Sequence, residues 1–184
     1  MIIKKDNLLI RSATVEDAET LTNWWNDGRI MAHAGFPNGL GQSLEETINQ
    51  IKKNDINLSQ RCIIQADNNR IGEMSFTIGE NFAEIGIKIC EVSCQNHGYG
   101  KCILRMLIDY LFTDEEINNK VKIEKIILDT NIDNKRAQHV YEKLGFRKVA
   151  TNVDVWKNQL GEWQTSIDYE MSLEDYRKVC LENM

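Results

Sequence analysis

The feature that most constrains the fold is a series of three strand-like runs followed by a strand–helix–strand unit. Strand-like runs stand at 61–66, 71–78 and 82–89, and short polar turns separate them, which predicts an antiparallel meander. An apolar helix is predicted over 98–112 and a compact strand over 126–130. Because a helical crossover joins parallel strands, a meander followed by a crossover predicts a mixed sheet.

Shorter signals before and after this unit complete the expected order of elements. Thr14 with Asp17, and Ser43 with Glu46, have the spacing of capping boxes, which predicts that a helix starts at each place. Gly145 stands where a helix over 134–144 would end. Further strands are predicted at 8–11, 146–156 and 163–172, and further helices over 14–25, 44–53 and 173–182.

Length and composition agree with one globular unit. The chain has 184 residues, of which 42% are hydrophobic and 27% charged, a composition that excludes disordered and collagen-like chains. We therefore expect a single domain over residues 1–184, of the α/β (α+β) class. Its mixed central sheet should have about six to seven strands and carry helices on both faces.

Charge and residue patterning exclude several classes of function. The 22 basic and 28 acidic side chains give a net charge of −6, which disfavours nucleic acid and favours a cationic partner. No apolar run reaches the ~18 residues of a membrane span, and the first residues lack the apolar core of a signal peptide. The five cysteines contain no Cys-x-x-Cys pair and the three histidines are scattered, so we expect reduced thiols in a cytoplasm and no metal.

A glycine-containing loop at residues 95–101 connects a predicted strand to the apolar helix. Successive main-chain N–H groups at the start of a helix bind anions, and Gly98 and Gly100 allow a phosphate to approach the backbone. A Walker loop is excluded because Cys102 replaces the required Ser or Thr, and a dinucleotide fingerprint because Ile103 replaces glycine. The alternative is an ordinary connection whose glycines serve turn geometry.

A second group of residues follows the next predicted strand. Asn131 and Asn134 stand at the transition from strand to helix, where their amides can bind a ligand or cap the helix. Ala137 and Tyr141 are four residues apart, so both lie on one face of that helix. For Tyr141 the alternative is a packed aromatic ring whose hydroxyl reaches the rim of the core.

Together, the two groups resemble the motifs of the Gcn5-related N-acetyltransferases (GNAT). The acetyl-CoA motif of that family, Gln/Arg-x-x-Gly-x-Gly/Ala, is matched by Gln95, Gly98 and Gly100. Its second motif is matched by six residues: Asn131, Asn134, Ala137, Tyr141, Gly145 and Phe146. Residues 10–18 and 163–171 are similar to the branch that contains ribosomal-protein and spermidine acetyltransferases.

The resemblance implies acetyl-CoA as co-substrate and no metal. In the family, the strand before the phosphate loop separates from the next parallel strand, and pantetheine pairs with main-chain groups in the gap. Pyrophosphate then lies on the amides of the loop, where Lys101 either adds a charge or is a solvated surface residue. The cofactor-binding residues implied are Ile87, Ile89, Cys90, Gln95, Asn96, His97, Gly98, Tyr99, Gly100, Lys101, Asn131 and Asn134.

The implied reaction is direct attack of a primary amine on acetyl-CoA in a ternary complex. Such an amine has a pKa of ~10.4, so a base must take its proton at neutral pH. Glu84 lies eleven residues before Gln95, the spacing of the glutamate in the histone-acetylating members, and is the expected base. Glu73 or solvent is the alternative. Tyr141 is the expected hydrogen-bond partner of the leaving thiolate.

The acceptor site is expected where the first two helices and their loop form a wall, as in the family. The candidate substrate-binding residues are Trp24, Trp25, His33, Phe36 and Glu73. Aromatic walls suit amines through cation–π contacts, although a tryptophan here is also a typical core residue. A polyamine, an aminoglycoside and a peptide N-terminus stay open as acceptors. A homodimer and a non-catalytic acyl-CoA-binding sensor of the same fold remain alternatives.

Overall fold

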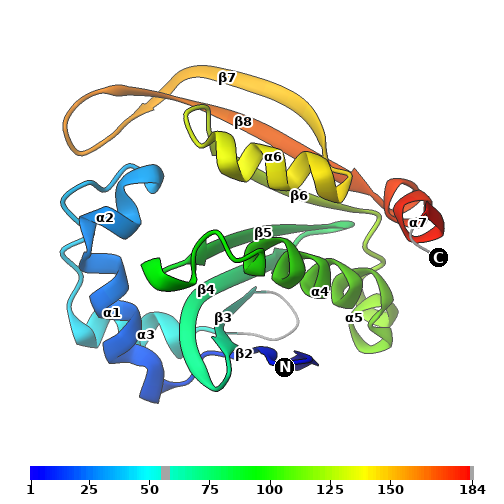
Figure 1. Cartoon of the computed structure of the whole chain (residues 1–184), viewed down its shortest axis with the longest axis horizontal. Coiled ribbons are helices and arrows are strands. Elements are labelled where there is room, and N and C mark those ends of the chain that lie inside the picture. Colours follow the sequence, from blue (N-terminus) through cyan, green and yellow to red (C-terminus); the bar gives the residue numbers. More distant parts are fainter. Residues whose placement is uncertain (55–58, 183–184) are drawn as a thin grey trace.

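One eight-stranded mixed sheet organises the protein, whose computed structural model describes residues 1–54 and 59–182 (Figure 1). The strands lie in the order β1-β2-β3-β4-β5-β6-β8-β7, and β5 with β6 is the parallel pair. Their bounds are β1 Ile2–Lys5, β2 Leu8–Ser12, β3 Ser59–Ala66, β4 Asn69–Ile78, β5 Phe82–Ile89, β6 Lys125–Asn131, β7 Arg147–Lys157 and β8 Trp163–Ser172. This confirms the expected meander, crossover and mixed sheet.

The strand count is higher than the six to seven expected, because β1 was not predicted. It pairs with β2 through the turn at Asp6, whose φ is +52°. Three of its four residues are exposed and one is half-buried, so β1 has none of the alternation between buried and exposed positions that identifies a strand in sequence.

Seven α-helices accompany the sheet in the described part of the chain. Both predicted capping boxes are present, the first opening a short 3₁₀ turn that leads into α1 and the second opening α3. The bounds are α1 Ala18–Asn26, α2 Gly28–Met31, α3 Leu44–Ile51, α4 Tyr99–Thr113, α5 Glu115–Lys120, α6 Lys135–Leu144 and α7 Leu173–Glu182. Helices α2 and α5 have four and six residues, too few to give a periodic signal. No described helix is long and apolar enough to cross a bilayer.

Two hydrophobic cores cover the two faces of the sheet. Helices α1, α2 and α3 enclose one of them against Ile63 of β3, and Leu21 is fully buried there. Helices α4, α5 and α6 enclose the larger one against the opposite face, where Ile64 and Phe76 meet Leu107. Figure 1 shows the two helix groups apart, the first in blue to cyan and the second in green to yellow. The helices therefore lie on both faces, as expected.

The sheet divides between β5 and β6, which are paired only at their beginnings. The paired residues are Phe82 with Lys125, Ala83 with Ile126 and Glu84 with Ile127. Beyond them β5 stays paired with β4, and β6 stays paired with β8. The facing edges of 85–89 and 128–131 therefore have no strand partner in the described sheet, and this division positions the site described next.

Candidate active site

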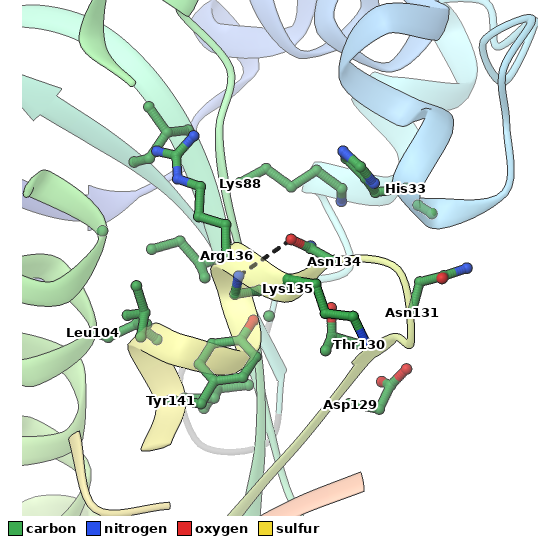
Figure 2. Close-up of a pocket in the computed structure, with 18 of the residues that line it drawn as sticks. His33, Lys88, Leu104, Asp129, Thr130, Asn131, Asn134, Lys135, Arg136 and Tyr141 are labelled. Carbon is green, nitrogen blue, oxygen red and sulfur yellow. Dashed lines mark hydrogen bonds between the residues drawn. The ribbon is translucent and has the colours of Figure 1, made fainter. Parts of the chain in front are cut away.

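A cavity of about 1000 Å³ lies where β5 and β6 separate (Figure 2). Side chains alternate between faces along a strand, so Glu84, Gly86 and Lys88 face the α1–α3 side while Ala83 and Ile85 face the larger core. Residues from both faces line the cavity, including Lys88 on one side and Tyr141 on the other. The cavity thus passes through the sheet at the division, and we call its two ends the acceptor side (α1–α3) and the donor side (α4–α6).

The glycine-containing loop forms the donor-side rim at the start of α4. Gly98 is the N-cap residue of α4 with φ of +79°, and Asn96 before it has φ of +64°. A Cβ atom added at Gly98 or Gly100 would meet nothing within 4 Å. Because both glycines line the cavity, their main chain is open to a ligand, and the helix start supplies N–H groups for an anion. This geometry fits a pyrophosphate.

Basic side chains stand beside this rim. Lys101 of α4 and Lys135 and Arg136 of α6 all line the cavity, and Arg136 donates a hydrogen bond of 3.4 Å to Oε1 of Gln95. The side-chain Nε2 of Gln95 donates in turn to the carbonyl of Ile89, at 3.0 Å. Lys135 and Arg136 were not selected from sequence, although two basic residues directly after a capping Asn were a usable signal for a phosphate site.

The two asparagines of the second motif line the cavity and also hold the turn that leads into α6. Asn134 is the N-cap of α6, and its Oδ1 accepts a hydrogen bond of 3.2 Å from the N–H of Ala137 (Figure 2). Asn131 accepts from the N–H of Asp133 at 2.8 Å and donates to Oε1 of Gln164 at 2.7 Å. Both amides therefore have local structural partners at the wall of the cavity.

Tyr141 reaches the cavity from the donor side. Its ring packs edge-on against Tyr169, with centroids 5.6 Å apart, and only 7% of the residue is exposed. No described residue forms a hydrogen bond with its hydroxyl, which Figure 2 shows directed toward the first turn of α6. Burial raises the pKa of Tyr141 to about 12, with smaller contributions from Asp129 and Tyr169. The hydroxyl is therefore protonated at neutral pH and free to donate.

Glu84 is the last residue of β5 that pairs with β6, so it stands where the strands part. Its side chain is exposed on the acceptor side, lines the cavity, and has no hydrogen-bond or ion-pair partner among the described residues. Ile87 and Ile89 follow it along the unpaired edge of β5 and also line the cavity. The carboxylate and this edge thus belong to one cavity, as expected from sequence.

Three residues predicted to bind cofactor do not line the cavity. Cys90 is 3% exposed and packs in the α1–α3 core. His97 is exposed, and its Nδ1 lies 2.7 Å from the carbonyl oxygen of Gln95. Tyr99 packs against the larger core. These three residues therefore do not form part of the cavity wall, although their neighbours in the chain do.

Glu73, the alternative base, is 1% exposed and lies outside the cavity wall. Its carboxylate pairs with Arg61 and with Nζ of Lys88 at 3.2 Å, and it accepts a hydrogen bond of 2.8 Å from Nε1 of Trp25. Burial raises the pKa of Glu73, but the charges of Lys88 and Arg61 outweigh this and hold it below its usual value. Glu73 is therefore ionised, and Arg61, Lys88 and Trp25 occupy its carboxylate oxygens. Its ion pair also positions Lys88 at the cavity.

Among the predicted acceptor residues, the structure places His33 at the cavity (Figure 2) and the aromatic residues in the core behind it. Trp24 and Trp25 are 6% and 3% exposed, and Nε1 of Trp24 donates to Glu91 at 2.9 Å. Phe36 packs against the same α1–α3 core. These three aromatic residues therefore pack in or against the α1–α3 core and do not form the wall of the cavity.

The tip of the β7–β8 hairpin helps to close the acceptor side. Trp156 lines the cavity and covers Gly35, where an added Cβ would lie 2.1 Å from the indole ring. Gln159 donates from its N–H to the carbonyl of Gly35 at 3.1 Å, and from its Nε2 to the carbonyl of Gly39 at 2.8 Å. The loop after α2, at Gly35 and Gly39, is therefore bound to the hairpin beside the cavity, a contact that no sequence motif indicated.

Comparison with known proteins identifies the family. A family model described as an acetyltransferase (GNAT) domain matches residues 7–147. The chain belongs to the GNAT acetyltransferase family. This membership makes it an acyltransferase, and acetyl-CoA is the co-substrate of GNAT enzymes. None of the curated protein sequences matches the chain significantly.

Solved structures share the GNAT fold along nearly the whole chain. The spermidine N-acetyltransferase of Vibrio cholerae, solved with CoA and spermine, is 22% identical and has a TM-score of 0.81 over 94% of this chain and 99% of that one. A GNAT acetyltransferase of Bacillus anthracis is 25% identical, with a TM-score of 0.75 and coverage of 95% and 99%. An acetyl transferase of Salmonella typhimurium that modifies the N-terminal serine of a 50S ribosomal protein is 18% identical. Its TM-score is 0.76, over 94% of this chain and 99% of that one.

Proposed function

We propose that this GNAT enzyme transfers the acetyl group of acetyl-CoA directly to a primary amine while both substrates are bound. The observation that carries the proposal is the cavity through the sheet, which has an anion-binding rim on one face and a free carboxylate, Glu84, on the other. A cavity open to both faces admits two substrates at once. No cysteine is among its lining residues, which agrees with transfer that needs no acyl-enzyme.

The donor side has what acetyl-CoA requires. The start of α4 and the basic group Lys101, Lys135 and Arg136 would hold the pyrophosphate and further phosphate charges. The unpaired edge of β5 at Ile87 and Ile89 would pair with the pantetheine amides, as a neighbouring strand does. A main-chain N–H on this edge would also stabilise the negative charge that develops on the thioester oxygen.

On the acceptor side, Glu84 is the proposed base that takes a proton from the amine nitrogen. The carboxylate is unpaired and stands where β5 and β6 part, next to the opening that joins the two sides. The five unpaired cysteines agree with a reducing compartment, and we place the reaction in the cytoplasm.

Tyr141 is the proposed hydrogen-bond donor to the leaving thiolate, which a Tyr141→Phe variant tests. We expect acetyl transfer to slow by about 10- to 150-fold, because hydrogen bonds to charged groups contribute roughly 1.5–3 kcal/mol. Acetyl-CoA affinity should change little, since the bond strengthens only as charge develops on sulfur. Single-turnover kinetics measure the effect even where product release limits turnover.

The matched control is Tyr110→Phe, which removes a hydroxyl from a half-buried tyrosine on α4 that does not line the cavity. This variant should keep the parental single-turnover rate. A Tyr141→Phe variant that is folded and equally fast would assign Tyr141 to packing alone.

The acceptor is proposed to be a small amine or a peptide N-terminus, the two kinds that the similar enzymes of Vibrio cholerae and Salmonella typhimurium modify. A panel of spermidine, an aminoglycoside and peptides with free N-termini, assayed by release of the CoA thiol, tests this directly. We expect amine-dependent thiol release with at least one class. Binding of acetyl-CoA without release for any amine would favour the non-catalytic sensor instead.

A further inference from the structure

A second carboxylate, that of Asp129, lines the same cavity (Figure 2). It follows Ile127, the last residue of β6 paired with β5, by two positions. Directly paired residues of parallel strands point to the same face, and faces alternate along a strand, so Asp129 shares the face of Glu84. No other described residue forms a hydrogen bond or an ion pair with its side-chain oxygens. The sequence signal was a lone Asp in the apolar run of β6.

In the proposed reaction the acceptor nitrogen loses two protons. A primary amine is bound mainly as its ammonium ion and must lose one proton before its lone pair can attack the thioester carbon. The N–C bond then forms, the C–S bond breaks with its electron pair on sulfur, and the nitrogen loses a second proton. The thiolate takes one proton, from Tyr141 or solvent. Glu84 can accept one of the two nitrogen protons, and either water or a second side chain at the cavity must accept the other.

We propose that Asp129 accepts the first proton, the one that the acceptor ammonium must lose before it attacks, and passes it to water in the cavity. This assignment rests on the proposed function. Asp129 is placed for it because it lies on the opposite strand of the division from Glu84, so that the two carboxylates approach the opening from its two sides. Tyr141 stands on the donor side of the same opening.

The surroundings of Asp129 make it a better base than an ordinary aspartate. Partial burial raises the pKa of Asp129, and the negative charge of Asp168, its direct partner on β8, raises it further. A hydrogen bond from the main-chain N–H of Asp129 lowers the pKa by a smaller amount. Nδ2 of Asn152 donates to Asp168 at 2.9 Å and fixes that carboxylate. The other charged or titratable groups that line the cavity come from four places in the fold. They are Glu84 and Lys88 of β5, Arg29 of α2 with His33 just after it, Lys101 of α4, and Asp133, Lys135, Arg136 and Tyr141 of the turn after β6 and of α6.

The other carboxylates nearby are less suited to this role. Glu73 is committed to Arg61, Lys88 and Trp25, as described above. Asp133 lines the cavity but lies in the turn between β6 and α6, beyond the end of the strand. Among the described acidic residues on the cavity wall, Asp129 is thus the one whose side chain has no partner from another residue and which lies on the strand opposite Glu84.

The test compares Asp129→Asn with the parent across pH, using the acceptor from the amine panel that reacts fastest. Near neutral pH we expect kcat/KM to fall by roughly 10²–10⁴-fold, the range for general base catalysis. This defect should shrink as the pH approaches the pKa of the amine, because the acceptor then arrives neutral. The Glu84→Gln defect should persist, since its proton leaves only during bond formation. The control Asp6→Asn, in an exposed turn, should match the parent.

A second variant has a readout that a structural role would not produce. Asp168→Asn removes the charge that raises the pKa of Asp129, so the acid limb of the kcat/KM profile should move to lower pH while the enzyme stays active. A folded Asp129→Asn variant with parental activity, or a defect that is constant with pH, would overturn the assignment and leave the proposed function intact. A parent that acetylates no amine in the panel would overturn both.

Discussion

Replacing Gly100 with glutamate should abolish acetyl-CoA binding while the protein stays folded. Gly100 lines the cavity, its φ is not in the left-handed region, and an added Cβ would meet nothing within 4 Å, so the new side chain would enter the space that we propose for phosphate. Two unit charges 4 Å apart near a protein surface interact by about 4 kcal/mol. The Kd for acetyl-CoA measured by calorimetry should therefore rise at least about 100-fold.

Two variants at the same position separate the causes. Gly100→Gln adds nearly the same bulk without the charge and should weaken binding less, whereas Gly100→Ala should stay close to the parent. Gly98 is a poorer site for this test, because its φ of +79° would strain any side chain. Unchanged acetyl-CoA affinity in folded Gly100→Glu protein would contradict the assignment of the phosphate site.

Replacing Glu84 with glutamine should lower kcat/KM by roughly 10²–10⁴-fold, the range for loss of a general base. The side chains have nearly the same shape, and Glu84 has no described partner to lose, so folding and acetyl-CoA affinity should be preserved. Single-turnover measurements with saturating acetyl-CoA give the rate of the chemical step.

The matched control is Glu80→Gln, in the exposed turn between β4 and β5 of the same hairpin. We expect the parental rate from this variant. If Glu84→Gln also keeps the parental rate, the second proton leaves through solvent or through another residue, and Glu84 is only part of the cavity wall.

The sequence allowed the central part of the fold to be predicted because its signals are local. Burial alternates with exposure over residues 74–78 of β4 and 83–86 of β5. The loop before α4 has glycines at positions 98 and 100, and Gly145 ends α6 with φ of +99°. Each of these features follows from residues close together in the chain. Residues Gln95, Gly98, Gly100 and Tyr141, which line the cavity, could therefore be selected from the sequence.

The acceptor side could not be predicted as well, because it depends on contacts between distant elements. The buried Trp25 donates a hydrogen bond to Glu73, 48 residues away. Because Glu73 already has this partner, it is less available as a base. The tie between Gln159 and the loop at Gly39 joins residues 120 apart. Asp129 becomes a candidate only through the strand register that ends at Ile127. None of these pairings has a local signal.

The central claim is direct transfer of an acetyl group to nitrogen, and isotope-labelled acetyl-CoA tests it most directly. Enzyme, labelled acetyl-CoA and the acceptor identified by the panel are mixed for one turnover, and the amine and the protein are both analysed by mass spectrometry. We predict one labelled N-acetyl group on the amine for each CoA thiol released, and no label on the protein. Thiol release without labelled amine, or label that first appears on the protein, would contradict the account.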